Sequence, residues 1–206
     1  MSFYENRILP HLIGLSCSQK PIMMERAKIL PHAEGRVLEV GLGAGPNLPL
    51  YNPAKVTQLI GLEPSAGMRR KAAPAIAASP VPVELIGLPG EEIPLDDDSI
   101  DTVVLTYTLC TIPDFNTALA QMRRVLKPGG RLLFSEHGAA PDPGVAKWQR
   151  RIEPVWKRIA GGCHLTRPIP RLIEESGFAI GDMEAWYLPG APKIAGFNYR
   201  GFASIR

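Results

Sequence analysis

Cysteine is scarce in this chain of 206 residues, and its spacing offers no metal-binding or disulfide pattern. The three cysteines, Cys17, Cys110 and Cys163, are an odd number and show no paired metal-ligand spacing. Disulfides are typical of oxidising compartments, whereas unpaired cysteines are the rule in a reducing cytosol. The sequence therefore predicts no disulfide, no bound metal ion and a cytoplasmic location.

Long hydrophobic runs are also absent. No segment approaches the run of about 18 apolar residues that suggests a membrane-spanning helix, and the N-terminus carries Glu5 and lacks a signal-peptide pattern. We therefore expect a soluble protein. The slightly basic composition leaves peripheral contact with a membrane surface open, and it does not determine the oligomeric state.

A strong excess of charge of one sign is missing as well. The net charge of +3 is mild. Three pairs of adjacent arginines, at 69–70, 123–124 and 150–151, lie in helical patterns, where solvated helix faces explain them more simply than nucleic-acid binding does. The sequence thus predicts a small-molecule substrate and no nucleic-acid partner. With 45% hydrophobic residues, the chain can bury the core of one domain spanning residues 1–206.

The most informative pattern that is present is a short apolar strand followed by a glycine-rich turn. The strand is predicted at Val37–Val40, and the turn contains Gly41, Gly43 and Gly45. Such glycines allow a tight turn and a close approach of the backbone to a ligand, and we expect a helix to start just after them. The pattern is compatible with a nucleotide-cofactor pocket and also with a tight α/β connection that binds nothing.

Three residues indicate which nucleotide would fit. Pro46 leaves no amide donor for a phosphate where a dinucleotide site needs a small residue. Glu39, just before the turn, would repel a pyrophosphate but can accept hydrogen bonds from an ammonium group. Glu63, at the end of the next strand, can bind ribose hydroxyls. This combination fits S-adenosylmethionine better than NAD.

Strand and helix patterns alternate along most of the chain, which predicts an α/β fold with a doubly wound, mostly parallel sheet. The predicted strands are Val37–Val40, Gln58–Leu62, Val81–Ile86, Ile100–Thr106, Arg131–Glu136, Phe178–Tyr187 and Lys193–Ser204. Ser65 and Asp114 are predicted to cap two of the helices, of which the second ends at residues 128–130.

Two segments lie outside this alternation. Residues 1–33 are predicted to form an N-terminal helical lid, in which Ile8–Leu15 is a short apolar piece and a helix ends before Pro31. Residues 138–177 are predicted to be an insertion after the fifth strand. Since ligands of such sheets bind at the carboxyl ends of the strands, this insertion is expected to cover the substrate.

Residues 35–136 resemble the class I S-adenosylmethionine-dependent methyltransferases. The resemblance rests on five motifs in order, namely the glycine turn, Glu63, Gly90–Pro94, Asp98–Asp101 and Arg124–Gly130. It implies a Rossmann-like sheet of seven strands with an antiparallel C-terminal strand. The cofactor-binding residues that it implies are Glu39, Gly41, Gly43, Gly45, Asn47, Glu63, Pro64, Met68, Gly90, Glu91, Thr106 and Tyr107.

One position departs from the family pattern. Many small-molecule members carry an aspartate that binds the adenine amino group, and this chain has Pro89 there. Adenine would then depend on the backbone of Gly90 and Glu91, or on the side chain of Glu91 or Glu92.

The C-terminal part resembles the methyltransferase-like branch whose animal members methylate alkyl thiols. The matching stretches are Thr108–Cys110, Ser135–His137, Trp148-Gln149, Glu153–Lys157 and Gly162–Arg167. The resemblance favours methyl transfer to a small, fairly apolar thiol. Two alternatives stay open, an O- or C-methyltransferase of quinone or lipid-like metabolites, and a non-catalytic partner subunit that only binds the cofactor.

Two histidines are candidate catalytic residues on the acceptor side. His137 directly follows the fifth strand, where a base for the substrate belongs, although a structural hydrogen bond would also explain it. His164 lies within the predicted insertion, and loop packing is its alternative role. Cys110 and Cys163 are more simply packing residues than reactive thiols.

Overall fold

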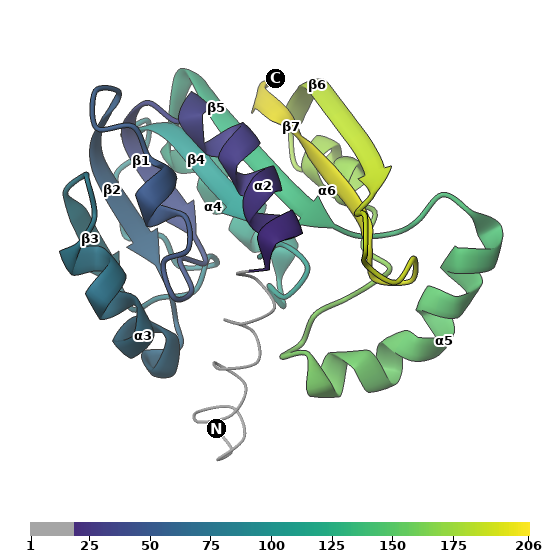
Figure 1. The fold of residues 1–206 in the computed structure, drawn as a ribbon. Helices are drawn as coiled ribbons and strands as arrows, with labels where there is room; N and C mark the ends of the chain where they lie inside the picture. The colour runs from purple at the N-terminus through teal and green to yellow at the C-terminus, as the bar shows by residue number, and fades with distance from the viewer. Residues whose placement is uncertain (1–18) are drawn as a thin grey trace.

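The computed structural model describes residues 19–206. Seven strands of this part of the chain form a mixed sheet in the order β3-β2-β1-β4-β5-β7-β6 (Figure 1). The strands are β1 Gly35–Val40, β2 Val56–Leu62, β3 Val83–Ile86, β4 Ile100–Thr106, β5 Leu126–His137, β6 Phe178–Tyr187 and β7 Phe197–Ile205. All neighbouring pairs are parallel except those of β7, which is antiparallel to both β5 and β6. The predicted fold class is therefore confirmed. The predicted lid piece Ile8–Leu15 and Cys17 lie outside the described residues.

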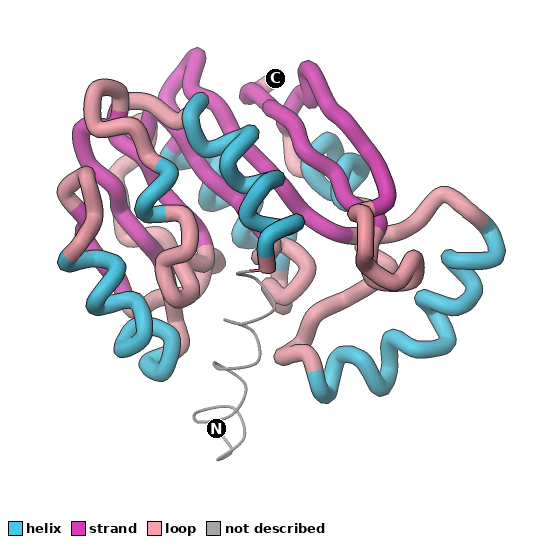
Figure 2. The backbone as a smooth tube through the Cα atoms, viewed as in Figure 1, coloured by secondary structure: helices cyan, strands magenta, loops and turns pink. Residues whose placement is uncertain are grey.

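Helices cover the two faces of this sheet and flank its edge (Figure 2). They are α2 Lys20–Ile29, α3 Ala66–Ala77, α4 Phe115–Val125, α5 Pro143–Ile159 and α6 Ile169–Glu175, with short 3₁₀ helices at η2 Leu30–His32 and η3 Leu48–Leu50. Both predicted caps are confirmed. The Ser65 hydroxyl accepts from the Met68 amide at 3.3 Å, and the Asp114 carboxylate accepts from the Thr117 amide at 3.1 Å.

Two local predictions were wrong. The glycine turn is followed by the 3₁₀ helix η3 and not by an α-helix, because Pro46 and Pro49 lack the amide protons that a longer helix needs. Helix α4 ends at Val125, and Leu126 already pairs with Ile100 as part of β5. The predicted helix stop at residues 128–130 thus lies inside the strand, since proline disfavours the helical conformation of the residue before it.

Successive residues of the central strands feed two separate hydrophobic cores, as the two-residue period of a strand requires. In β1, Val37 packs in the core that contains Ile29 of α2, whereas Leu38 packs in the core that contains Leu119 of α4 and Ile173 of α6. All five side chains are at most 1% exposed. Figure 1 shows α2 and α4 on opposite sides of the sheet. Burial on both faces holds the strand ends, and hence any site built there, in place.

Helix α5 is the exception to this packing, since it lies away from the sheet (Figure 1). Gln149 is the single buried residue among its 17. Within residues 19–206, no helix combines the length and the apolar composition that crossing a bilayer requires.

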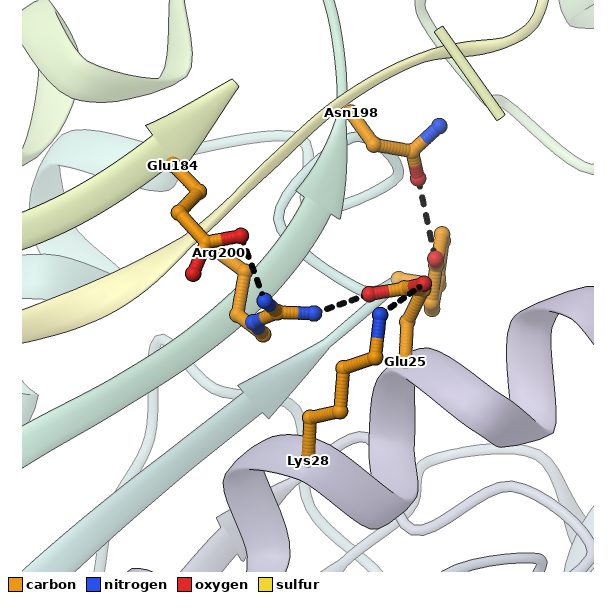
Figure 3. A network of polar contacts seen from close by, with 6 residues as sticks. Glu25, Lys28, Glu184, Asn198 and Arg200 are labelled. Carbon is orange, nitrogen blue, oxygen red and sulfur yellow. Dashed lines mark hydrogen bonds and ion pairs between the residues drawn. The ribbon is translucent and has the colours of Figure 1, made fainter. Parts of the chain in front are cut away.

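A polar network joins α2 to the antiparallel end of the sheet (Figure 3). Glu25 of α2 pairs with Lys28 at 2.9 Å and with Arg200 of β7, and Arg200 also binds Glu184 of β6 at 2.7 Å. Glu25 and Arg200 are largely buried, so their ion pair is protected from solvent screening. These contacts fix α2, which lies along one face of the sheet, to β7 and through it to β6.

Candidate functional site

A cavity of about 300 Å³ opens at the carboxyl ends of β1, β2 and β4. This is the edge where a doubly wound sheet binds its ligands. Nine of the twelve predicted cofactor residues line it, namely Gly41, Gly43, Glu63, Pro64, Met68, Gly90, Glu91, Thr106 and Tyr107. Pro89 lines it beside Gly90.

The glycine turn forms one wall of the cavity with its backbone. The amides of Gly41 and Leu42 both donate to the Leu62 carbonyl at 2.9 Å, which holds the turn against the end of β2. Gly41 has a φ of 79°, and a Cβ atom there would lie 2.4 Å from the Thr108 side chain. Only glycine combines this conformation with this close approach.

Glu63 lines the cavity at the tip of β2 with its carboxylate held by two backbone amides. Oε1 accepts from the Ser65 amide at 2.8 Å, and Oε2 accepts from the Gly43 amide at 3.0 Å. Burial raises the pKa of Glu63, while these two amides and the nearby Arg69 oppose that shift. The carboxylate is thus oriented before any ligand arrives, and each oxygen keeps a lone pair for a further donor.

Glu39, Asn47 and Gly45 are predicted cofactor residues that are not part of the cavity wall. The Glu39 carboxylate accepts from Asn47 Nδ2 at 2.9 Å and from the Tyr51 hydroxyl at 2.7 Å, and it is 1% exposed. Gly45 packs against Leu48. Glu39 and Asn47 lie behind the wall with their polar atoms engaged within the protein. The expected contact of Glu39 with an ammonium group stays a prediction.

Burial dominates the electrostatics of Glu39. It raises the pKa of Glu39 to about 7, against the lowering effects of Tyr51, Arg26 and Asn47. Part of the Glu39 population is therefore protonated near neutral pH.

Arg26 of α2 lines the cavity, and the sequence analysis missed it. Its Nη1 donates to Asn47 Oδ1 at 2.8 Å and to Thr106 Oγ1 at 2.5 Å, and its guanidinium lies 5.2 Å from the centre of the Tyr107 ring. Its Nε is buried and has no hydrogen-bond partner among the described residues. No sequence signal pointed to Arg26, because an arginine in a short helix is usually solvated.

Tyr107 carries backbone strain at the end of β4. Its φ of 56° lies in the left-handed region, which costs a residue with a side chain about 1–2 kcal/mol. Its hydroxyl donates to Asn198 Oδ1 of β7 at 2.9 Å, and burial raises its pKa above the usual value. Strain of this kind is typical of functional sites, where the surroundings hold the residue in place.

His137 does not line the cavity but joins a cluster with Cys110 and Cys163 just behind it. His137 Nε2 lies 3.1 Å from Cys163 Sγ, and the donor atoms of all three residues lie within 4.8 Å of one another. The Trp156 indole also donates to Cys163 Sγ at 3.3 Å. The ring of His137 stacks beside Tyr107, with 6.5 Å between the ring centres.

The cluster shifts the pKa values of its members. A hydrogen bond with Cys110 and, against burial, the contact with His137 lower the pKa of the Cys163 thiol to about 4. Burial opposes charge on His137, but its hydrogen bond to Cys163 raises its pKa above the usual value. The sequence spacing gave no hint of the cluster, because its members come from the loop after β4, the end of β5 and the loop after α5.

His164, the second predicted catalytic residue, is also absent from the cavity lining. Its Nδ1 lies 3.1 Å from Glu153 Oε1, and Glu153 Oε2 accepts from the Thr166 amide at 2.8 Å. These contacts join the loop after α5 to α5 itself. His164 thus has a place in the internal structure of this segment.

The predicted insertion contributes Gly161 to the cavity, opposite Thr111 and Pro113 of the loop after β4. Two buried anchors hold it. Arg167 donates to the Leu109 and Ile112 carbonyls, the latter at 2.7 Å. Gln149 accepts from the Ala140 amide at 2.9 Å and donates to the carbonyls of residues 138 and 194, each at 3.1 Å. Helix α6, at the end of the insertion, packs instead on the sheet.

The charges of the cavity decide which cofactor fits. Arg26, Glu63 and Glu91 are its charged lining residues among the described part of the chain. A pyrophosphate would meet two carboxylates and a single cation, which disfavours a dinucleotide. The Arg26 guanidinium suits a carboxylate, and Glu63 suits hydroxyl donors. The lining therefore fits S-adenosylmethionine, which carries an amino acid, a ribose and no phosphate.

Comparisons with known proteins agree with this geometry. A family described as a methyltransferase domain matches residues 38–134. The chain is 35% identical over 190 residues to human thiol S-methyltransferase TMT1B, covering 87% of this chain and 77% of the relative. It is 31% identical over 153 residues to human thiol S-methyltransferase TMT1A, covering 72% of this chain and 62% of the relative.

Solved structures share the fold. An S-adenosylmethionine-dependent methyltransferase of Leishmania major superposes with a TM-score of 0.71 at 18% identity, covering 98% of this chain and 80% of the other. With the cavity, the glycine turn and the related sequences in agreement, the chain belongs to the family of S-adenosylmethionine-dependent methyltransferases, and S-adenosylmethionine is its cofactor.

Proposed function

We propose that the protein transfers the methyl group of S-adenosylmethionine to the sulfur of a small, fairly apolar thiol. The observation that carries this proposal is the likeness to the human protein named thiol S-methyltransferase TMT1B. Because the match covers 87% of this chain, it extends beyond the general methyltransferase region at residues 38–134. The likeness therefore includes chain outside the part that binds the cofactor in many methyltransferases.

Different residues of the chain would hold different parts of the cofactor. In the proposal, Glu63 accepts hydrogen bonds from the ribose hydroxyls, and the Arg26 guanidinium attracts the carboxylate of the methionine part. The glycine turn lets the backbone approach closely, and the backbone of Gly90 and Glu91 borders the base. Support comes from the positions of these residues in the cavity lining.

The acceptor side needs little proton chemistry if the acceptor is a thiol. S-adenosylmethionine supplies an electrophilic methyl group when it is bound. A thiol with a pKa of about 8.5 is partly ionised at neutral pH, and its thiolate is a strong nucleophile. The protein would then contribute mainly by positioning the acceptor and excluding water, and positioning alone can supply about 7–11 kcal/mol. Ile112, Pro113 and Gly161 offer an apolar lining for this task.

We propose that residues 138–177 form the cover of the acceptor within a single domain, with the loop around Gly161 as the part that faces the cavity. Arg167, which follows this loop, is bonded to the loop after β4, and this contact supports a fixed cover. The helical N-terminal part would complete the enclosure through Arg26. Of that part, α2 belongs to the described residues.

A base role for His137 or His164 stays a prediction. A base acting on a thiol is needed most where the thiol is least ionised. The alanine variant of a base would therefore lose kcat mainly below about pH 8 and approach the wild type above the thiol pKa of about 8.5. A loss of kcat that is equal at all pH values would indicate a structural role instead.

We further propose that the protein works in the cytoplasm and contacts a membrane surface through α5. Neither Cys110 nor Cys163 is in a disulfide, which supports a reducing compartment. Trp148, Val155 and Ile159 follow one another on α5 at helical spacing, and each is more than half exposed. Exposed basic residues accompany them on α5, including an arginine 5.4 Å from the Trp148 ring. This combination is typical of helices that lie on anionic lipid surfaces.

A panel of acceptors tests the activity. The full chain is incubated with S-adenosylmethionine and, separately, with an alkyl thiol, a phenol, a quinol and an amine, and methylated products are measured by mass spectrometry. We expect S-methylated product from the thiol. Turnover of the phenol or quinol without turnover of any thiol would contradict the proposal, and tight cofactor binding without any product would favour the partner-subunit alternative.

Sedimentation with vesicles tests the membrane contact. Vesicles of phosphatidylcholine with and without phosphatidylserine are mixed with the full chain. We expect binding to the anionic vesicles that weakens in Trp148→Ser, whereas Met183→Ser on β6 serves as a control that alters another exposed apolar side chain. Equal binding of the wild type and Trp148→Ser would overturn the role of α5.

A further inference from the structure

We propose that Cys110, His137 and Cys163 form a binding site for one thiophilic divalent metal ion of the chemical class of Zn²⁺. This site is separate from the cofactor cavity, since none of the three residues is part of the cavity lining. It goes beyond the methyl transfer proposed above and does not depend on the identity of the acceptor.

The geometry of the three donor atoms suits such an ion. They come from three different elements and lie within 4.8 Å of one another, and His137 Nε2 is 3.1 Å from Cys163 Sγ. In a tetrahedral zinc site, with bonds of about 2.0–2.3 Å, ligand atoms lie about 3.3–3.8 Å apart. Small side-chain movements would therefore bring all three donors to bonding distance of one ion.

The chemistry of the donors selects the class of metal. Two sulfur atoms and one imidazole nitrogen are soft or borderline ligands, which favour zinc and related transition metals over magnesium or calcium. Cys110 is 2% exposed and Cys163 is 8% exposed, so water competes little for the site. The Trp156 indole donates to Cys163 Sγ at 3.3 Å, a contact of the kind that supports metal-bound sulfur from outside the ligand set.

The position of the site gives it a structural consequence. An ion bound there would join the loop after α5, through Cys163, to the loop after β4 and to the end of β5. The backbone of that loop already lies against the loop after β4, since the His164 amide donates to the Cys110 carbonyl at 2.9 Å. Three protein ligands also leave one coordination position for water or another small ligand, as in zinc sites with two cysteines and one histidine. The ion would thus fix the acceptor cover against the sheet.

Metal content and cobalt spectroscopy test the proposal. The full chain is purified under reducing conditions, freed of metal with a chelator and titrated with Zn²⁺ or Co²⁺. We expect one ion per chain by elemental analysis, and for Co²⁺ a thiolate-to-cobalt charge-transfer band. Cys163→Ser and His137→Gln each remove one ligand and should each weaken metal binding at least about tenfold. This factor corresponds to a loss of about 1.4 kcal/mol or more in binding free energy. The control His164→Ala, next to the cluster but outside it, should bind as the wild type does.

A measurement on the wild type covers the case in which a variant fails to fold. Alkylation of Cys110 and Cys163 by iodoacetamide is followed by mass spectrometry with and without Zn²⁺. We expect Zn²⁺ to slow alkylation of both residues at least about tenfold, because metal-bound thiolates react poorly. Equal alkylation rates, binding of much less than one ion per chain, or cobalt binding unchanged in Cys163→Ser would each overturn the proposal.

Discussion

The two sides of the site are built in different ways. On the cofactor side, the wall consists of strand ends whose neighbours are buried on both faces of the sheet. On the acceptor side, the segment 138–167 includes an α-helix with one buried residue, and it is held by a few polar anchors. Gln149 and Arg167 make most of these anchoring contacts with backbone carbonyls.

This difference indicates which part of the molecule determines the cofactor and which part determines the acceptor. A wall made of strand ends tolerates little change, because each residue is positioned by the hydrogen-bonded sheet and by a packed core. A cover held by a few buried polar contacts can vary elsewhere at little cost, since most of its surface is exposed. This arrangement suits a family that shares one cofactor and has many acceptors.

The largest expected effect lies in the glycine turn of the cofactor side. Gly41→Ala places a side chain at a φ of 79° and a Cβ atom 2.4 Å from Thr108, so we expect a loss of about 2–5 kcal/mol in unfolding free energy. Gly129→Ala is the control, because Gly129 has a similar φ of 80° with no atom within 4 Å of its added Cβ. Gly129→Ala should lower the unfolding free energy only by the conformational cost of about 1–2 kcal/mol. Equal losses in urea unfolding would show that the close approach to Thr108 is unimportant.

The next effect concerns the anchor of the acceptor cover. Arg167→Met leaves the buried Leu109 and Ile112 carbonyls without their donor, which should lower the unfolding free energy by about 2–4 kcal/mol. Arg171→Met removes only an exposed ion pair with Glu175 and should change the unfolding free energy by less than about 0.5 kcal/mol. Urea unfolding measures both. A similar small change in the two variants would mean that the cover has no strong anchor at Arg167.

A smaller effect on binding is expected at the tip of β2. Glu63→Ala removes the carboxylate that lines the cavity, and we expect a loss of about 1.5–3 kcal/mol in cofactor binding, or about 10- to 150-fold in Kd. Calorimetry with S-adenosylhomocysteine measures it. Glu84→Ala, an exposed acid on the neighbouring strand β3, is the matched control and should leave Kd unchanged. An unchanged Kd in Glu63→Ala would mean that the ribose lies elsewhere.

The smallest effect is a pH dependence of stability. Because burial raises the pKa of Glu39 from 4.5 to about 7, the folded state binds its proton more tightly than the unfolded state. The contribution of Glu39 to the unfolding free energy is therefore greatest below pH 4.5. This contribution, about 1–3 kcal/mol, is lost as the pH rises to about 7. Glu39→Gln mimics the protonated form and should lack this loss. Unfolding free energies are measured between pH 5 and 8. If they change equally with pH in the wild type and in Glu39→Gln, the raised pKa of Glu39 is contradicted.

Much of the fold could be predicted because its signals are local. The strands β4 and β6 have the predicted bounds, and Ser65 and Asp114 cap the helices that were predicted to follow them. Strand alternation, caps and glycine turns depend on residues a few positions apart. The start of β7 was predicted four residues too early, at Lys193 instead of Phe197, since strand ends depend on pairing with a neighbour.

The candidate site was predictable only on its cofactor side. Gly41 and Gly43 of the glycine turn, Glu63 and Gly90 are local signals that follow strand ends, and these four residues line the cavity. Glu39 was expected there too, but Asn47 and Tyr51 engage its carboxylate behind the wall. Side-chain partners of this kind cannot be read from a strand pattern, because they depend on how separate elements pack.

The sequence by itself determined the α/β class, the edge of the sheet where ligands bind and the type of cofactor, since each follows from patterns within one or two consecutive elements. The tertiary structure alone decided the position of Arg26, which contacts Thr106 from 80 positions away, and the meeting of Cys110, His137 and Cys163. These contacts join elements that are distant along the chain. Only the packing of those elements on the sheet brings such side chains together, and no local pattern records it.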